Sequence, residues 1–147
     1  MAEAELIIAE IKSGVASSGF QRSAGASFDN SNPDNYGPGS KQLSESLDLY
    51  ALDSQAKTAF EGIRRVYEGN LAVNANTSGF QLPGFENFAG YKRLVYSEAS
   101  KTAVFYAVFT NGSILVFMTY FGDETEVTQT DFEKLIRAAD ARINAYS

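Results

Sequence analysis

The stretch TAVFYAVFTNGSILVFMTYF, from Thr102 to Phe121, decides the fold of the C-terminal half of this chain. Two runs rich in β-branched and aromatic residues flank the pair Asn111-Gly112. An Asn-Gly pair between such runs predicts a β-hairpin, because a type I′ turn requires a positive φ at both central residues. We therefore expect two antiparallel strands, Ala103 to Phe109 and Ser113 to Phe121, joined by a two-residue turn.

This turn also fixes the expected pairing of the two strands, because it places Thr110 opposite Ser113. The pairs on one face are Val108 with Leu115, Tyr106 with Phe117 and Val104 with Thr119; on the other they are Phe109 with Ile114, Ala107 with Val116 and Phe105 with Met118. Both faces are apolar, whereas a half-buried hairpin alternates apolar and polar residues. The pattern predicts that helices cover both faces, or that one face contacts a second subunit.

The other elements follow from hydrophobic periodicity and from capping residues. Helices are expected over residues 3–16, from Asp53 or Ser54 to Gly69, and over a C-terminal segment capped by Thr128 or Thr130. Short strands are expected at Leu47 to Ala51 and at Tyr91 to Tyr96. The predicted fold class is α+β: an antiparallel sheet of about four strands with helices packed on it.

The region from Ser17 to Ser46 is predicted to be a long polar loop, because Ser, Gly, Asn, Asp and Pro dominate it. Loops of this length inside a compact domain are uncommon and are often functional or disordered. Phe20, Phe28 and Tyr36 are expected to pin the loop to the body of the protein. A second loop is expected from Asn70 to Asn87. The length of 147 residues predicts a single domain over residues 1–147.

The composition restricts the available chemistry. The chain contains no Cys and no His. This excludes disulfides, thiolate nucleophiles, imidazole bases and metal sites that depend on Cys or His as ligands. The oxygen-rich segment from Asp29 to Asn35 does not fit a calcium loop, because Asp34 occupies the sixth position, where the chain turn needs Gly. No metal site and no cofactor is therefore predicted.

The net charge of −6 limits the partners. Nucleic-acid binding depends largely on cationic residues that neutralise phosphates, so no nucleic-acid partner is expected. Arg64, Arg65, Lys92 and Arg93 are interpreted as solvated charges rather than a basic patch. No apolar run is long enough to span a bilayer, and the acidic N-terminus lacks the features of a secretory signal. We expect no membrane partner and a cytoplasmic location, or export if a signal peptide was removed.

The candidate binding residues are strand tyrosines beside a basic side chain, together with an acidic cluster at a strand end: Tyr91, Arg93, Tyr106, Tyr120, Asp123 and Glu124. The tyrosines would line a pocket, or would serve as ordinary cross-strand packing. The acidic residues would form a cation site or an acidic docking patch, or would simply favour the start of the next helix. No residue is assigned a catalytic role.

The predicted order of strand, strand, strand and helix from Gly90 onward resembles the core of small ribosome-dependent toxin nucleases of the RelE class. The strand and helix from Leu47 to Gly69, followed by the hairpin and the last helix, also resemble extracytoplasmic sensor and lipoprotein domains of bacteria. The toxin nucleases are strongly basic, and this chain is not. Neither resemblance transfers a functional residue to this chain.

These observations favour a non-catalytic binding or interaction protein that recognises another protein or a small ligand. In its concrete form, it would be an acidic inhibitor or immunity-type protein that shields a basic enzyme surface by electrostatic complementarity. The alternatives are a small enzyme that uses Asp or Glu, Tyr and Lys, and a structural subunit of a larger assembly. A homodimer is expected if one apolar face of the hairpin is left for a second copy. A pocket with at least two perturbed titratable groups would favour the enzyme.

Overall fold

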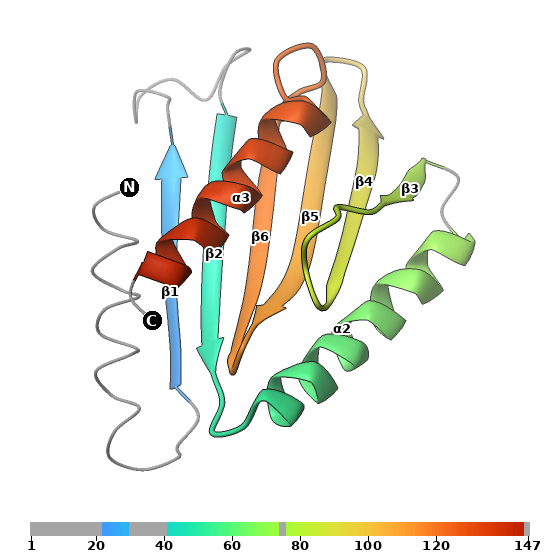
Figure 1. Cartoon of the computed structure of the whole chain (residues 1–147). Coiled ribbons are helices and arrows are strands. Elements are labelled where there is room, and N and C mark those ends of the chain that lie inside the picture. Colours follow the sequence, from blue (N-terminus) through green and yellow to red (C-terminus); the bar gives the residue numbers. More distant parts are fainter. Residues whose placement is uncertain (1–21, 30–40, 74–75, 146–147) are drawn as a thin grey trace.

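The computed structural model describes residues 22–29, 41–73 and 76–145. Within these ranges the chain forms a six-stranded sheet and two helices, with strand order β1-β2-β6-β5-β4-β3 (Figure 1). All neighbouring strands are antiparallel. The elements are β1 (Arg22–Asp29), β2 (Lys41–Leu49), α2 (Asp53–Val73), β3 (Thr77–Phe80), β4 (Phe88–Tyr96), β5 (Lys101–Asn111), β6 (Ile114–Asp123) and α3 (Gln129–Ala145). The predicted α+β class, with helices packed on an antiparallel sheet, is confirmed.

The hairpin formed by β5 and β6 lies where the sequence predicts it, but its turn is displaced. Asn111 pairs with Ile114, so the turn residues are Gly112 and Ser113. The predicted pairs are therefore wrong by two residues; Phe105, for example, pairs with Tyr120. Side chains alternate with a period of two along a strand, so a displacement of two leaves every residue on its predicted face.

Gly112 and a tertiary contact explain the displaced turn. Gly112 has a φ of 59°, whereas no non-glycine residue in the described ranges has a positive φ. A type II′ turn needs a positive φ at its first central residue only, and glycine provides it there. Asn111 is thereby left in the strand, where its side-chain amide donates hydrogen bonds to Asp140 Oδ1 at 2.8 Å and to Asn144 Oδ1 at 2.9 Å, both on α3.

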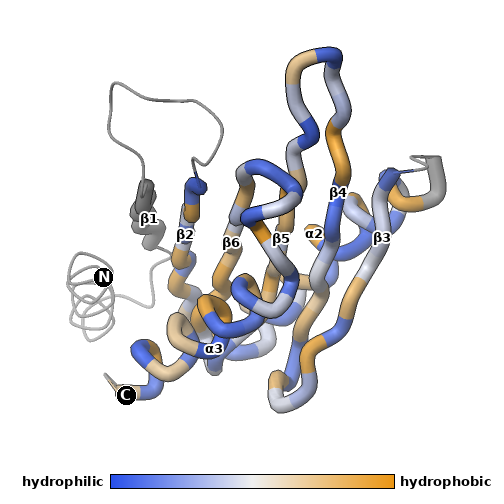
Figure 2. Tube along the Cα trace, turned by 90° about the horizontal axis from the view of Figure 1, so that it is seen from above, coloured by the Kyte–Doolittle hydropathy of each residue, from blue (hydrophilic) through white to orange (hydrophobic). Residues whose placement is uncertain are grey.

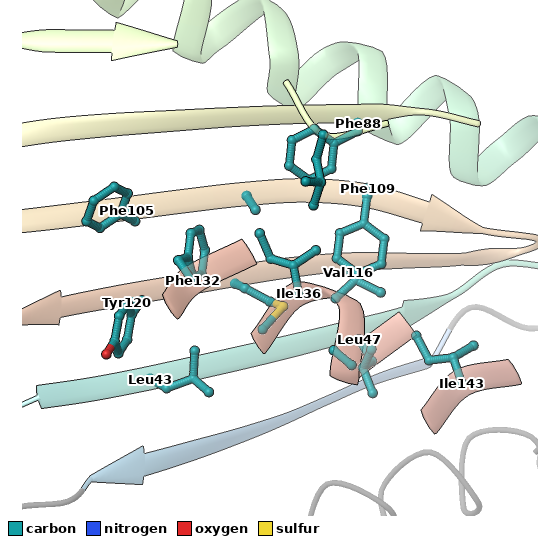
Figure 3. Packing of buried hydrophobic residues seen from close by; sticks show 14 of the residues in the cluster. Leu43, Leu47, Phe88, Phe105, Phe109, Val116, Tyr120, Phe132, Ile136 and Ile143 are labelled. Carbon is teal, nitrogen blue, oxygen red and sulfur yellow. The ribbon is translucent and has the colours of Figure 1, made fainter. Parts of the chain in front are cut away.

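Helices pack on both faces of the hairpin, as predicted. Figure 1 shows α3 lying across β2, β6 and β5, and Figure 3 shows the side chains between them. The buried residues of α3 are Phe132, Ile136, Ala139 and Ile143. On the opposite face, Phe60 of α2 packs with Val108 and Leu115 in a separate cluster. The hairpin is therefore the middle layer of the molecule, and its two apolar faces supply two distinct cores.

The ends of the helices differ in part from the sequence prediction. Thr128 Oγ1 accepts a hydrogen bond from the Asp131 backbone N–H at 3.2 Å, so Thr128 caps α3 and the alternative at Thr130 is wrong. At the start of α2 the Gln55 side chain accepts from the Leu52 backbone N–H at 3.2 Å, which places the cap one residue before Asp53. Gly69 does not end α2, which continues to Val73.

Two predicted loops contain strands. In the predicted loop from Ser17 to Ser46, residues 22–29 form β1 and residues 41–46 belong to β2. Their polar composition is compatible with strands because side chains alternate: the odd-numbered positions of β2 are buried from Leu43 to Leu49. The second predicted loop contains β3 (Thr77–Phe80). The first predicted helix, Phe20 and Tyr36 lie outside the described residues, as does the side chain of Phe28.

Hydrophobic positions recur with short spacing along the strands, which Figure 2 shows as an alternation of orange and blue. β4 has a run of four buried residues from Phe88 to Tyr91, and β5 has a run of equal length from Ala107 to Thr110. The run in β5 lies in the centre of the sheet, with β6 on one side and β4 on the other. None of the helices in the described ranges is both long enough and apolar enough to cross a bilayer.

A buried ion pair joins the C-terminal half of α3 to β2. Arg142 Nη2 lies 3.2 Å from Glu45 Oε2, and the Glu45 residue is 3% exposed. Burial raises the pKa of Glu45 above its usual 4.5, and the Arg142 charge opposes that rise only in part. Removing one partner of such a pair leaves an isolated buried charge, which costs more than the pair itself contributes.

Replacing Gly69 with alanine should stabilise the protein. Gly69 lies inside α2, is exposed and has open space where a Cβ would be placed. Alanine is favoured over glycine in a helix by about 1 kcal/mol, so Gly69→Ala should raise the free energy of unfolding measured in urea by up to that amount. Gly112→Ala is the control, because its positive φ should make alanine destabilising. A destabilised Gly69→Ala would show that α2 ends at this residue.

Replacing Arg142 with methionine should destabilise the protein in a pH-dependent manner. We expect a loss of about 3–5 kcal/mol near neutral pH, because Glu45 is left charged and buried. The pKa of Glu45 in the folded variant lies further above the unfolded value, so the loss develops as pH rises above 4.5 and is relieved below it. The loss of stability is measured by urea unfolding at one pH above 4.5 and at one pH below it. The double variant Glu45→Met/Arg142→Met should recover most of the loss; equal losses at both pH values would contradict the assignment.

Candidate functional site

A cavity of about 350 Å³ opens between the second half of α2 and the strands that face it. We call it the tyrosine cavity. It is lined by Val66, Tyr67, Asn70, Thr77, Tyr91, Arg93 and Tyr106. Its volume lies at the lower end of the range found for small-molecule sites.

An apolar trough of about 450 Å³ adjoins the tyrosine cavity. It is lined by Ala59, Gly62, Ile63, Val66, Tyr67 and Phe117. Val66 and Tyr67 line both hollows, so the two form one groove along α2. Val66 is 64% exposed, which is unusual for a valine in the apolar stripe of a helix that packs on a sheet. The groove therefore leaves apolar surface open to a ligand.

The aromatic side chains of the groove come from four elements, α2, β4, β5 and β6, that meet on the α2 face of the sheet. Strand pairing places Tyr91 of β4 opposite Tyr106 of β5. Tyr67 projects from α2 between them, with ring centroid distances of 5.0 Å to Tyr91, 5.4 Å to Tyr106 and 6.0 Å to Phe117. Contacts at these distances stabilise aromatic groups beyond the burial of their area. The tyrosines therefore form a preorganised aromatic wall.

Burial keeps the hydroxyls of Tyr67 and Tyr91 in their neutral form. It raises the pKa of Tyr67, which the neighbouring Tyr106 raises further. It also raises the pKa of Tyr91, and the charge of Glu68 acts in the same direction. The Tyr91 hydroxyl donates to the Arg64 carbonyl oxygen at 3.4 Å, so it is already directed toward α2. The cavity thus presents protonated phenols, which can donate hydrogen bonds and cannot serve as bases near neutral pH.

The four cations considered as a basic patch do not form one. Arg64 is paired with Glu61 at 2.6 Å and with Glu68 at 2.8 Å. Lys92 lies on the opposite face of β4, with its Nζ 5.5 Å from the centroid of the Phe105 ring. Arg93 is exposed at the rim of the tyrosine cavity. It is the one charged residue among those that line the two hollows.

The structure brings together three of the six candidate residues named from the sequence. Tyr91, Arg93 and Tyr106 line the same cavity. Tyr120 lies on the other face of the sheet, where it is buried and stacks on Phe132 of α3 with a centroid distance of 5.8 Å. Its placement in a binding site is therefore wrong, because the alternation along β6 directs it into the core under α3.

Asp123 and Glu124 lie apart from the cavity, in a polar hollow beside residues 97–101. Asp123 Oδ1 accepts hydrogen bonds from the Thr125 backbone N–H at 2.9 Å and from its hydroxyl at 2.6 Å, and these bonds lower the pKa of Asp123. The Tyr96 hydroxyl donates to Glu124 Oε2 at 3.4 Å. In the ranges described, no group of acidic side chains is arranged to hold a metal ion. The local hydrogen bonds suit the interpretation of a structured turn before α3.

The candidate residues named from the sequence omit eight that line the groove: Ala59, Gly62, Ile63, Val66, Tyr67, Asn70, Thr77 and Phe117. Tyr67 continues the apolar stripe of α2, because it follows Phe60 and Ile63 at spacings of seven and four residues. The sequence prediction ended the apolar stripe of this helix at Val66. Extending the stripe by one residue would have identified Tyr67. Thr77 gave no signal, because its strand was interpreted as a loop.

The comparisons with known proteins identify no family. No family model matches the chain, and no curated protein matches it. Among solved structures, a protein of unknown function from Pseudomonas aeruginosa shares 11% identity, with 82% of this chain and 83% of that chain covered and a TM-score of 0.47. The extracellular domain of PknH from Mycobacterium tuberculosis shares 9% identity, with 92% and 90% covered and a TM-score of 0.42.

Alkaline pH should destabilise the protein through the tyrosine cavity. The pKa of Tyr67 is raised above 10.0 in the folded protein. At a pH between the unfolded and folded pKa values, the unfolded chain has therefore released a proton that the folded protein still holds. The free energy of unfolding then falls as pH rises. Tyr67→Phe removes this titration and should lose less stability than the wild type between about pH 9 and about pH 11. Identical profiles for Tyr67→Phe and the wild type would contradict the assignment.

Proposed function

We propose that this protein is a non-catalytic binding protein that takes a small ligand in the groove formed by the tyrosine cavity and the apolar trough. The observation that carries the proposal is the preformed aromatic wall of half-buried Tyr67 and Tyr106 with buried Tyr91 behind them, which adjoins the exposed Val66. Sites for small molecules are typically concave, mostly apolar and supplied with a few polar groups, and this groove has those features.

The groove favours a small ligand over a shielded enzyme surface. An acidic inhibitor or immunity-type protein would present acidic residues on its contact surface. Here the concave surface holds one cation, Arg93, and no acidic side chain among its lining residues. The acidic residues Asp123 and Glu124 lie in a separate hollow. A second copy of this chain is an alternative occupant that the experiment below distinguishes.

The enzyme alternative has one observation in its favour and two against it. The cavity does hold two tyrosines with perturbed pKa values, Tyr67 and Tyr91. Both shifts are upward, away from neutral pH, whereas a general acid or base works best with a pKa near the operating pH. No Lys lines either hollow, since Lys92 points to the other face. The arrangement therefore suits binding better than proton transfer.

Binding can be tested with the neutral fluorophore N-phenylnaphthylamine, whose emission rises in an apolar environment. We expect saturable binding at one site per chain. Val66→Asp should weaken that binding by about tenfold or more, because the ligand would have to desolvate a carboxylate in the middle of the groove. Val66 is exposed, so the variant should fold.

The matched control is Leu52→Asp, which places the same charge on another exposed apolar residue, at the start of α2 and outside the groove. It should bind like the wild type. Equal loss in both variants, or no saturable binding by the wild type, would contradict the proposal. Light scattering of the same samples separates a second copy as the occupant: a dimer that only Val66→Asp disrupts would assign the groove to a subunit interface.

A further inference from the structure

The groove changes in polarity along its length. The trough end is lined by apolar side chains and a glycine, with Phe117 from the sheet and Ile63 from α2. The cavity end adds hydroxyl, amide and guanidinium groups from Thr77, Asn70 and Arg93. An occupant that matches both ends has an apolar body and a polar head, because an apolar head would leave the buried Thr77 hydroxyl without a hydrogen bond and would desolvate the Arg93 charge.

The charge at the polar end is positive and is not neutralised within the described part of the chain. Among the residues that the structure describes, no carboxylate lies within ion-pair distance of the Arg93 guanidinium. The charge of Glu68 raises the pKa of the nearby Tyr91, but the Glu68 carboxylate is already paired with Arg64 at 2.8 Å. A guanidinium binds carboxylates well because its N–H groups match both oxygens, and a hydrogen bond between charged groups is stronger than one between neutral groups.

A second polar group points to the same end. Thr77 lies beside Arg93 in the pairing of β3 with β4. Its Oγ1 is buried and has no hydrogen-bond partner among the described residues, although the residue lines the cavity. Buried hydroxyls in folded proteins are nearly always hydrogen-bonded, so an unpartnered one beside a cavity indicates a missing partner.

Together these features define one class of ligand. We propose that the groove binds a monoanionic amphiphile: an alkyl or aryl body over Val66, Tyr67 and Phe117, with a carboxylate head between Arg93 and Thr77. This inference rests on the proposed function and adds the charge and direction of the ligand. The hydroxyls of Tyr67 and Tyr91 are compatible with it, because their raised pKa values keep them neutral beside an anion.

Arg93 has an alternative, structural role at the end of α2, which the test must distinguish from ligand binding. The C-terminal end of α2 carries a partial negative charge, and a nearby cation stabilises such an end. That role predicts a loss of stability in Arg93→Gln without any change in the preference for a head group. The ligand-binding role predicts a change in preference, whether or not stability changes.

The experiment compares three ligands that share a dodecyl chain, namely dodecanoate, dodecanol and dodecyltrimethylammonium. Each is used below its micelle concentration to displace N-phenylnaphthylamine from the intact chain. We expect dodecanoate to bind about tenfold more tightly than dodecanol, the scale of one charge-assisted hydrogen bond, and the cation to bind most weakly. Arg93→Gln should remove the difference between dodecanoate and dodecanol while leaving dodecanol unchanged.

Arg65→Gln is the matched control, because Arg65 is exposed on α2 and lies outside the lining of both hollows. It removes the same charge and should preserve the ranking. Equal binding of dodecanoate and dodecanol, or an equal effect of Arg65→Gln and Arg93→Gln, would overturn the inference while the proposed function stands. Failure of the wild type to bind the fluorophore would overturn both.

Discussion

Burial of both faces of the β5–β6 hairpin is the constraint on which the rest of the structure depends. A strand directs alternate side chains to opposite faces, so a hairpin that is apolar throughout must be covered twice. α3 covers one face with Phe132, Ile136 and Ile143, and α2 contacts the other through Phe60. Each face buries several large side chains, at roughly 25 cal/mol for every Å² of apolar surface removed from water. This layered arrangement also creates the groove, because α2 covers its face only in part.

The contrast between the two helices explains where function is expected. The α3 face is closed: its core residues are buried, and the Glu45–Arg142 pair and the Asn111 hydrogen bonds attach the helix to the sheet. The second half of α2 stands over the sheet with Val66, Gly62 and Gly69 exposed. Tyr67 bridges the gap by stacking on Tyr91 and contacting Tyr106. A rigid, closed core on one side thus supports an open aromatic surface on the other.

Much of the fold could be predicted from local sequence patterns. The location of the hairpin followed from its two apolar runs and a glycine turn, and the α3 cap followed from Thr128. The strands β1 and β3 could not be predicted, because polar and glycine-containing edge strands resemble loops until a neighbour pairs with them. Of the residues that line the groove, the sequence identified Tyr91, Arg93 and Tyr106, because they are strand tyrosines and a basic residue beside them. Tyr120 does not belong with them, because the alternation along β6 places it with Met118 on the opposite face, in the core under α3.

The sequence by itself determined that the hairpin is apolar on both faces, that both must be covered by helices or by a second subunit, and that any activity must proceed without Cys or His. These are properties of residue type and period, which the chain carries before it folds. Only the tertiary structure decided the register of the hairpin, because Asn111 leaves the turn to bind Asp140 and Asn144, far away in sequence. It likewise decided the site, since Tyr67, Tyr91 and Tyr106 come from three elements whose rings meet only when α2 packs on the sheet.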